Sequence, residues 1–343
     1  PMAAELSEPL APADPKEGAR SGGLSYQELL DTDSREVPEV LRWQSARELP
    51  RVRVPISRYT SQEFHEVEVE RVWKKVWQMA CREEELVEVG DFVVYDIAEI
   101  SLVVVRSAPG EIRAFRNVCL HRGRQIKDED GRADELRCPF HGWAWNLDGS
   151  MKQLPCRWDF PHVDRDDYAL PEVKVGLWGG FVFVNMDPDC APLEDFLGDL
   201  SAHFATWPLE DRYKEAHVAK VLPCNWKVAQ EAFMEAYHVV ATHPQLLAGI
   251  GDANSQYDAW GNFSRALTPQ MTPSPHMAEE PTEQDMMDTM MTRSIDGPPT
   301  MEVPEGMTAR ELLGQLGRMG LQATVPSVGK VSDAELADSI YYT

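Results

Sequence analysis

Four residues in two short motifs have the types and spacing of metal ligands. Cys119 and His121 belong to the motif CLHRG, and Cys138 and His141 follow in CPFHGW, after sixteen intervening residues. Thiolate and imidazole groups are common ligands of zinc and of iron–sulfur clusters. Each Cys/His pair is expected in a turn between strands, and two such loops can close on one metal centre from opposite sides.

The ligand types leave two kinds of metal centre open. Zinc would bind all four side chains on a single ion, with two sulfurs and two nitrogens. A Rieske [2Fe–2S] cluster would place both thiolates on one iron and both imidazoles on the other. The neighbouring Pro139, Gly123 and Gly142 favour the cluster, because tight loops present backbone N–H groups to its sulfurs.

A second group of candidate ligands lies in residues 231–244, EAFMEAYHVVATHP, which the apolar spacing predicts to be an amphipathic helix. Glu235 and His238 share a face of such a helix, whereas His243 lies about half a turn away. Pro244 disfavours helical geometry at His243, so a widened turn or an early helix end would bring His243 back towards His238. The open iron site that binds O2 takes two imidazoles and one carboxylate, and His238 and His243 would supply the two imidazoles, whereas Glu235 is not expected to be an iron ligand.

Taken together, these motifs resemble the large, or alpha, subunit of the Rieske non-haem iron aromatic ring-hydroxylating oxygenases, over about residues 45–343. The two Cys/His motifs are similar to that family's cluster motif. Rieske proteins of respiratory cytochrome complexes carry an additional Cys in each loop, and this chain has none at those positions. The family's iron-site pattern is matched here by Asn225, Trp226, Lys227, Glu231, Glu235, His238 and His243.

The resemblance implies a role for each candidate residue. A [2Fe–2S] Rieske cluster would be held by Cys119, His121, Cys138 and His141. A mononuclear Fe(II) would be held by His238 and His243. In the family an Asp well over a hundred residues after the second His completes the iron site, so the third carboxylate ligand is expected beyond Thr343. The chain is thus expected to be truncated at its C-terminal end, and the fragment is expected to be inactive alone.

Glu235 occupies a position at which the family usually has Asp. The resemblance implies that this carboxylate bridges a cluster-ligating His of a neighbouring subunit and His238, and so carries electrons between subunits. By that analogy, Glu235 would pair with His141 of another copy. Some branches of the family use Glu here, including branches that act on quaternary ammonium compounds. The alternative for Glu235 is an ordinary carboxylate on a helix face.

The implied activity is that of a terminal oxygenase component. A reductase using NAD(P)H, with or without a ferredoxin, would supply electrons, and O2 would be used for cis-dihydroxylation or monooxygenation of an aromatic or other apolar small molecule. The alternatives are oxidative demethylation of a methylated or quaternary amine, a Rieske electron carrier without oxygen chemistry, and a zinc-binding structural protein. The expected assembly is a homotrimer, with or without a small beta subunit.

The expected fold class is α+β, with an antiparallel β Rieske domain and a truncated helix-grip catalytic domain. Residues 1–23 are expected to be a flexible tail, 24–77 a helical segment that packs on the catalytic domain, 78–188 the Rieske domain and 189–343 the incomplete catalytic domain. A capping box is predicted at Thr60 and Glu63. Further predictions are a strand at 216–223, irregular structure at 268–307, and helices at 308–320 and 332–340. The last of these is expected to be a surface helix capped by Ser332, so its aspartates, Asp333 and Asp338, are not favoured as iron ligands.

Composition excludes several classes of partner. The net charge of −24 is unfavourable for binding nucleic acid, because phosphate contacts need clustered Lys and Arg. No apolar run reaches the length needed to cross a membrane, and a cytoplasmic location is expected.

Disulfides are not expected among the six Cys. The cysteines outside the two motifs, Cys81, Cys156, Cys190 and Cys224, are expected to be reduced and packed.

Overall fold

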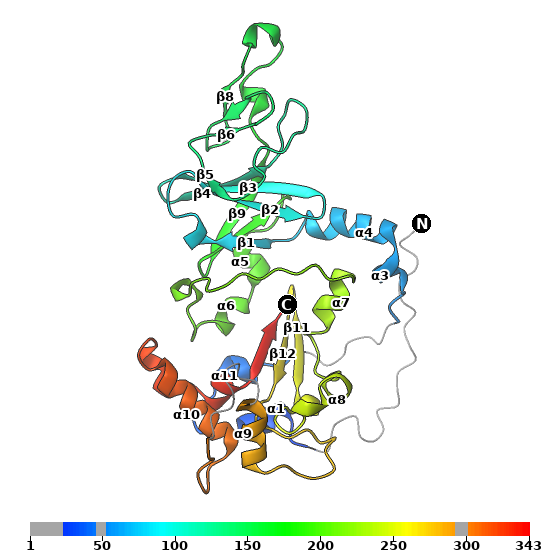
Figure 1. Cartoon of the computed structure of the whole chain (residues 1–343), viewed down its shortest axis with the longest axis vertical. Helices are drawn as coiled ribbons and strands as arrows, with labels where there is room; N and C mark the ends of the chain where they lie inside the picture. Colours follow the sequence, from blue (N-terminus) through cyan, green and yellow to red (C-terminus); the bar gives the residue numbers. More distant parts are fainter. Residues whose placement is uncertain (1–22, 46–52, 292–300) are drawn as a thin grey trace. The chain divides into compact units, whose positions relative to one another are not determined.

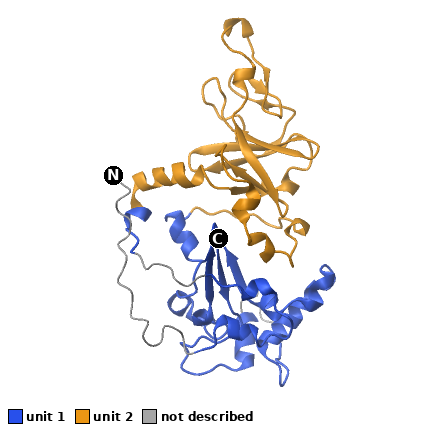
Figure 2. Cartoon of the chain, turned by 180° about the vertical axis from the view of Figure 1, so that it is seen from behind, with its two compact units in different colours: residues 1–59, 222–343 blue, residues 60–221 orange. Residues whose placement is uncertain are grey.

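A computed structural model describes residues 23–45, 53–291 and 301–343 (Figure 1). The chain divides into two compact units, which are coloured separately in Figure 2. Residues 60–221 form one unit, here called the β unit, and residues 1–59 with 222–343 form the other, here called the mixed unit. The first contains a large antiparallel sheet, and the second combines helices with a small sheet, so the chain has the α+β fold class expected from its sequence.

The β unit contains a seven-stranded sheet of order β1-β10-β9-β4-β3-β2-β5 and a three-stranded sheet of order β6-β7-β8. All of the strand pairs in these two sheets are antiparallel. The strands are β1 (Gln78–Arg82), β2 (Asp91–Ile97), β3 (Ile100–Ala108), β4 (Glu111–Arg116), β5 (Gly131–Arg132), β6 (Leu136–Arg137), β7 (Ala144–Trp145), β8 (Met151–Gln153), β9 (Glu172–Trp178) and β10 (Phe181–Asn185).

Strand β3 shows how the large sheet is buried on both of its faces. Successive side chains of a strand point to opposite faces. Val103 and Val105 belong to one apolar cluster, whereas Leu102 and Val104 belong to another. The cluster that contains Val103 also contains Cys119 and Cys138, so one face of the sheet packs against the loops that carry the candidate ligands.

The mixed unit contains the antiparallel sheet β11-β12-β13. Its strands are β11 (Gln256–Trp260), β12 (Phe263–Thr268) and β13 (Ser339–Tyr342). The α-helices in the described part of the chain are α1 (Tyr26–Leu30), α2 (Glu39–Arg42), α3 (Ser57–Thr60), α4 (Gln62–Glu68), α5 (Leu193–Leu197), α6 (Leu200–His203), α7 (Trp226–Glu231), α8 (Val239–Thr242), α9 (Glu283–Met291), α10 (Ala309–Leu321) and α11 (Asp333–Ala337). No helix among the described residues is both long enough and apolar enough to span a bilayer.

Short segments with other helical geometry also occur among the described residues. Residues Val69–Trp73 form a π-helix. The 3₁₀-helices are Glu83–Glu85, Arg157–Asp159, Asp166–Tyr168, Leu209–Asp211, Pro244–Leu246, Asp252–Asn254 and Pro326–Lys330.

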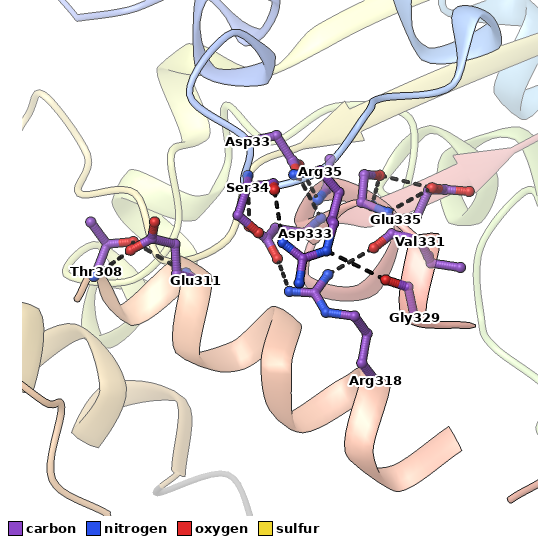
Figure 3. A network of polar contacts seen from close by, with 12 residues as sticks. Asp33, Ser34, Arg35, Thr308, Glu311, Arg318, Gly329, Val331, Asp333 and Glu335 are labelled. Atoms are coloured by element: carbon purple, nitrogen blue, oxygen red, sulfur yellow. Dashed lines mark hydrogen bonds and ion pairs between the residues drawn. The ribbon is translucent and has the colours of Figure 1, made fainter. Parts of the chain in front are cut away.

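The buried Asp333 and the half-buried Asp33 tie the N-terminal segment to the C-terminal helices of the mixed unit. Asp333 accepts hydrogen bonds from Arg318 (2.5 Å) and from the backbone N–H of Ser34 (3.1 Å). In return, Asp33 accepts hydrogen bonds from the N–H groups of Asp333 and Ala334, at the start of α11 (Figure 3). An acidic side chain at this end of a helix satisfies N–H groups that have no partner within the helix.

Asp338 is the centre of the second network. Its carboxylate forms a bidentate ion pair with Arg310, at 2.5 and 2.7 Å, and its side chain has no solvent-exposed surface. The Tyr26 hydroxyl (2.9 Å) and the Gln270 backbone N–H (3.0 Å) donate to the same carboxylate. Every lone-pair direction of Asp338 is therefore used, as a buried charge requires.

Several local predictions were wrong, and each error has a physical reason. Thr60 ends α3 and does not begin a helix, because Ser61 is the cap of α4 and accepts from the Phe64 N–H. Residues 216–223 are exposed and form no strand, since they pair with no neighbour in the described chain. The segment predicted to be irregular contains α9, although residues 292–300 lie outside the described residues.

The C-terminal predictions were correct in part. Helix α10 begins after the cap Thr308, and Ser332 and Glu335 form the expected capping box of α11. That helix ends at Ala337 and is followed by β13, so the predicted helix over 332–340 was too long. Asp333 and Asp338 are buried, not at the surface, because each is paired with an Arg of α10.

We expect Asp338→Ala to lower the free energy of unfolding by about 3–5 kcal/mol, because it leaves the buried Arg310 guanidinium without a counter-charge. Urea unfolding of the variant and the parent protein measures this difference. Asp31→Ala is the matched control, since the Asp31–Arg42 pair (2.8 Å) is largely exposed and its loss should cost less than about 1 kcal/mol. Equal destabilisation by the two substitutions would contradict a structural role for the buried pair.

Candidate metal sites

The two Cys/His loops have the same backbone hydrogen-bond pattern. Cys119 N–H donates to the Arg124 carbonyl (2.8 Å), and Gly123 N–H donates back to the Cys119 carbonyl (2.9 Å). In the second loop, Cys138 N–H donates to the Trp143 carbonyl (2.8 Å), and the N–H of Gly142 donates to the carbonyl of Cys138 (3.1 Å).

Glycine is needed at the turn of each loop. Gly123 has φ of 76° and Gly142 has φ of 75°, a region that residues with a Cβ adopt only at a cost. The glycines in CLHRG and CPFHGW therefore close the two loops in the same way.

The four side chains meet as two pairs. His121 Nδ1 and His141 Nδ1 are 3.2 Å apart, close to the roughly 3.4 Å expected for two nitrogens bound to one tetrahedral metal at about 2.1 Å. The Cys119 and Cys138 thiols are both buried, and Cys138 is near enough to contribute to the raised pKa of Cys119. Thiols on the core side and imidazoles on the exposed side are the arrangement that a cluster with two differently ligated irons requires.

The electrostatic surroundings of the pairs differ. Burial raises the pKa of the Cys119 thiol, and Cys138 adds to the rise, whereas the backbone N–H groups of His121 and Arg122 stabilise the thiolate. Loss of solvation lowers the pKa of His121, and the nearby His141 and Arg122 lower it further. The His121 imidazole therefore favours the neutral form that binds metal.

Aromatic rings fix the orientation of the two imidazoles. Trp143 stacks on His121 with ring centroids 5.0 Å apart and an interplanar angle of 10°. Phe140 lies against His141 with centroids 3.9 Å apart. Trp143 is buried in the same apolar core as the two thiols, so the ring that orients His121 is itself held by that core.

The histidines of the second candidate site converge because the predicted helix is broken. Helix α7 ends at Glu231, and the next helix begins only at Val239. His243 has φ of −129° and ψ of 48°, outside helical geometry, as expected of a residue before proline. The ring centroids of His238 and His243 are consequently 5.5 Å apart, and the angle between the ring planes is 73°. The prediction of a continuous helix over residues 231–244 was therefore wrong. The expected approach of His238 and His243 to each other is observed.

Glu235 orients the ring of His238. Glu235 Oε1 is 2.7 Å from His238 Nδ1, and Glu235 Oε2 accepts from the His238 backbone N–H at 3.0 Å. A carboxylate can only accept, so Nδ1 carries the proton and Nε2 keeps its lone pair. Metal-binding histidines in proteins have this arrangement, in which a carboxylate orients the ring. The donor set of His238 and His243 therefore fits a mononuclear iron.

A third ligand is not present in the described part of the chain. Among those residues, no group of three or more His, Cys, Asp or Glu side chains is placed to hold one metal ion. Asp333 and Asp338 are occupied by Arg318 and Arg310. The location of a third carboxylate beyond Thr343 stays a prediction.

Family comparisons separate the alternatives that the ligand types leave open. Residues 76–164 match the Rieske [2Fe-2S] domain, and residues 200–312 match the ring hydroxylating alpha subunit (catalytic domain). The chain belongs to the alpha subunits of the Rieske oxygenases. The first match favours an iron–sulfur cluster over zinc, and the second identifies a domain that an electron carrier alone would not need.

Relatives of this Rieske oxygenase subunit act on two kinds of substrate, according to their names. Carnitine monooxygenase oxygenase subunit from Escherichia coli (strain K12) is 35% identical over 214 residues, which cover 62% of this chain and 57% of that protein. Chlorobenzene dioxygenase subunit alpha from Cupriavidus sp. (strain PS12) is 31% identical over 231 residues, 64% of this chain and 50% of that one. The chain therefore spans only about half the length of these curated relatives.

Solved structures share the fold. A quaternary ammonium Rieske monooxygenase in complex with L-carnitine superimposes with a TM-score of 0.57 and 26% identity, and the match covers 62% of this chain and 61% of that chain. The antiparallel Rieske domain followed by an α+β catalytic domain is common to both.

Sequence reasoning missed one contact of the iron site and misjudged two cysteines. The Tyr257 hydroxyl accepts a hydrogen bond from the Ala236 N–H (2.8 Å), and no local sequence signal joins two residues that are far apart in the chain. All six cysteines are free, as expected. Cys156 and Cys224 are exposed, so the prediction that they are packed was wrong.

We expect Cys138→Ser to abolish the cluster, because a neutral hydroxyl replaces a thiolate ligand. The visible absorption spectrum and the acid-labile sulfide content of the purified protein measure the loss. Cys156→Ser is the matched control, since Cys156 is an exposed, free thiol of the same unit. A Cys138→Ser protein that kept its full sulfide content would contradict the ligand assignment.

Proposed function

We propose that this chain is the cluster-carrying and iron-binding part of a terminal oxygenase that hydroxylates a small molecule. The observation that carries the proposal is the convergence of His238 and His243, with the Nε2 lone pair of His238 kept free by Glu235. The Rieske domain supplies the second requirement, a one-electron carrier, at Cys119 and Cys138 with His121 and His141.

Each set of residues has a distinct part in this function. With both groups bound, the cluster would supply electrons singly, and Fe(II) would activate O2 for insertion into the substrate. The buried thiols hold the inner side of the cluster, and the exposed imidazoles face the solvent, where a partner protein can approach. Glu235 keeps the proton of His238 on Nδ1 and directs Nε2 to the metal. An NAD(P)H-dependent reductase, with or without a ferredoxin, would be the electron source of this cytoplasmic enzyme.

Glu235 is proposed to be the link between subunits. Its Oε1 is already engaged by His238 Nδ1, and its side chain is 40% exposed, so the carboxylate remains accessible to a second imidazole. A hydrogen bond from His141 of another copy would complete a short path from cluster to iron. Because the donor and acceptor surfaces differ, such contacts close as a head-to-tail ring, most simply a homotrimer, with or without a small beta subunit.

The proposed substrate is an aromatic or other apolar molecule. A cavity of about 180 Å³ lies beside the segment that carries the iron ligands, and its walls are almost entirely apolar. Phe233 and Met234, just before Glu235, form one wall, and Tyr257 and Tyr341 of the sheet form another. The acidic group of the lining, Asp258, is neutralised by an ion pair with Arg265 (2.8 Å).

A methylated or quaternary amine is the second candidate. Glu235 in place of Asp favours it, as does the similarity to carnitine monooxygenase. The three aromatic rings of the cavity lining could also receive an ammonium group through cation–π contacts.

We expect His238→Ala to abolish product formation and to remove the mononuclear iron, while the visible spectrum of the cluster is unchanged. The two metal sites use separate segments in separate compact units, so the loss of one ligand should not affect the other. The assay supplies the holoenzyme with a reductase and NADH, offers chlorobenzene and L-carnitine separately, and identifies the products.

His276→Ala is the control, since His276 is a half-exposed histidine of the same unit outside the site. Product from His238→Ala at the parent rate would exclude the iron assignment. Turnover of L-carnitine but not of chlorobenzene would show that the substrate is a methylated or quaternary amine and not an aromatic or other apolar molecule.

We expect Glu235→Gln to slow electron transfer from cluster to iron, because the amide keeps the shape but loses the charge that binds two imidazoles. Glu235→Asp should have a smaller effect. In a single turnover, the cluster is reduced, O2 and substrate are added, and the reoxidation of the cluster is followed by its absorption. The exposed Glu279→Gln is the control. Reoxidation at the parent rate in Glu235→Gln would leave Glu235 as an ordinary surface carboxylate.

A further inference from the structure

The break between α7 and α8 leaves backbone N–H groups that a continuous helix would have satisfied. Two of them are bonded by side chains instead. His238 N–H donates to Glu235 Oε2 (3.0 Å), and Ala236 N–H donates to the Tyr257 hydroxyl oxygen (2.8 Å). Ala236 is 5% exposed, so without that acceptor its N–H would be buried and unpaired, which proteins rarely tolerate.

Tyr257 is well suited to hold this turn. It lies in β11, where it pairs with Ala266 of β12, and the neighbouring pairs of the two strands keep a regular register. The position of its hydroxyl is therefore set by the sheet and not by the turn itself. Burial raises the pKa of Tyr257, so the phenol remains neutral across the physiological range.

The alternative conformation of the segment would separate the metal ligands. If residues 232–238 continued α7 as a regular helix, Ala236 N–H would bond to a backbone carbonyl and would no longer need Tyr257. His238 and His243 would then lie about half a turn apart on the helix surface, and they could not bind one ion. The tyrosine hydroxyl thus favours the broken conformation over the helical one.

We propose that Tyr257 is a positioning residue, which holds the break between α7 and α8 and thereby keeps Glu235 and His238 in the arrangement that binds iron. The inference rests on the proposed iron site. Its ring also lines the apolar cavity beside Phe233 and Met234, so the residue that would touch the substrate is the one that holds the metal-binding turn.

The test compares Tyr257→Phe with Tyr341→Phe in the holoenzyme. Both substitutions remove a phenol hydroxyl from the lining of the same cavity, but only Tyr257 bonds the Ala236 N–H. Each protein is stripped of mononuclear iron, and its affinity for Fe(II) alone is measured by anaerobic equilibrium dialysis. We expect Tyr257→Phe to weaken Fe(II) binding about 10- to 100-fold, as for other residues that orient metal ligands, and Tyr341→Phe to leave it unchanged.

Two further measurements separate positioning from general destabilisation. Hydrogen exchange should show a protected Ala236 amide in the parent protein and faster exchange over residues 232–238 in Tyr257→Phe. In a Glu235→Gln background, Tyr257→Phe should weaken Fe(II) binding by much less, because both residues act on the same imidazole. If Tyr257→Phe only destabilised the fold in general, its effect on Fe(II) binding would add to the effect of Glu235→Gln.

Unchanged Fe(II) affinity and exchange in Tyr257→Phe would overturn the proposal, and so would full additivity with Glu235→Gln. Rapid exchange of the Ala236 amide in the parent protein would also overturn it, even if the variant did not fold. If instead His238→Ala bound Fe(II) as tightly as the parent protein, the proposed iron site would be wrong. The exchange data would still show whether Tyr257 holds the turn.

Discussion

The contact between Glu235 Oε1 and His238 Nδ1, at 2.7 Å, is the interaction on which the iron site depends. It fixes which nitrogen of the imidazole carries the proton and therefore which one can bind a metal. A regular helix would place Glu235 and His238 on one face but would leave His243 on another. The contact is useful only because the chain is broken before α8, so a local departure from helical geometry is what makes two histidines five residues apart into a pair.

The ligands of the two candidate metal sites are brought together by different kinds of interaction. In the β unit, each Cys/His loop is closed by its own backbone hydrogen bonds and anchored by a thiol in the apolar core. Little outside the two loops and that core is needed to bring the ligands together. In the mixed unit, the turn that carries Glu235 and His238 has few backbone bonds of its own and depends on Tyr257 from the sheet. The cluster site is thus encoded locally, whereas the iron site depends on long-range packing.

The predictions from sequence succeeded where the interactions are short in range. The capping box at Ser332 and the glycine turns at Gly123 and Gly142 depend on neighbours within a few residues. The predictions failed where residues that are distant in the sequence determine the local conformation. Residues 216–223 have the composition of a strand but no partner in the described chain, and a strand without a partner has no ladder of hydrogen bonds to stabilise it.

The sequence by itself determined the chemistry of the protein: two thiols and two imidazoles in paired loops, and two further histidines with a carboxylate three residues before the first. Residue types and short spacings can be read directly from the sequence, and they are enough to identify the family. Only the tertiary structure decided which of these groups meet and which ring nitrogen of His238 faces Glu235. It buried Asp333 and Asp338 against arginines of α10 and so removed them from the set of free carboxylates. It also brought the hydroxyl of Tyr257 to the Ala236 N–H, because strand pairing sets the position of β11 and no feature within the turn can do so.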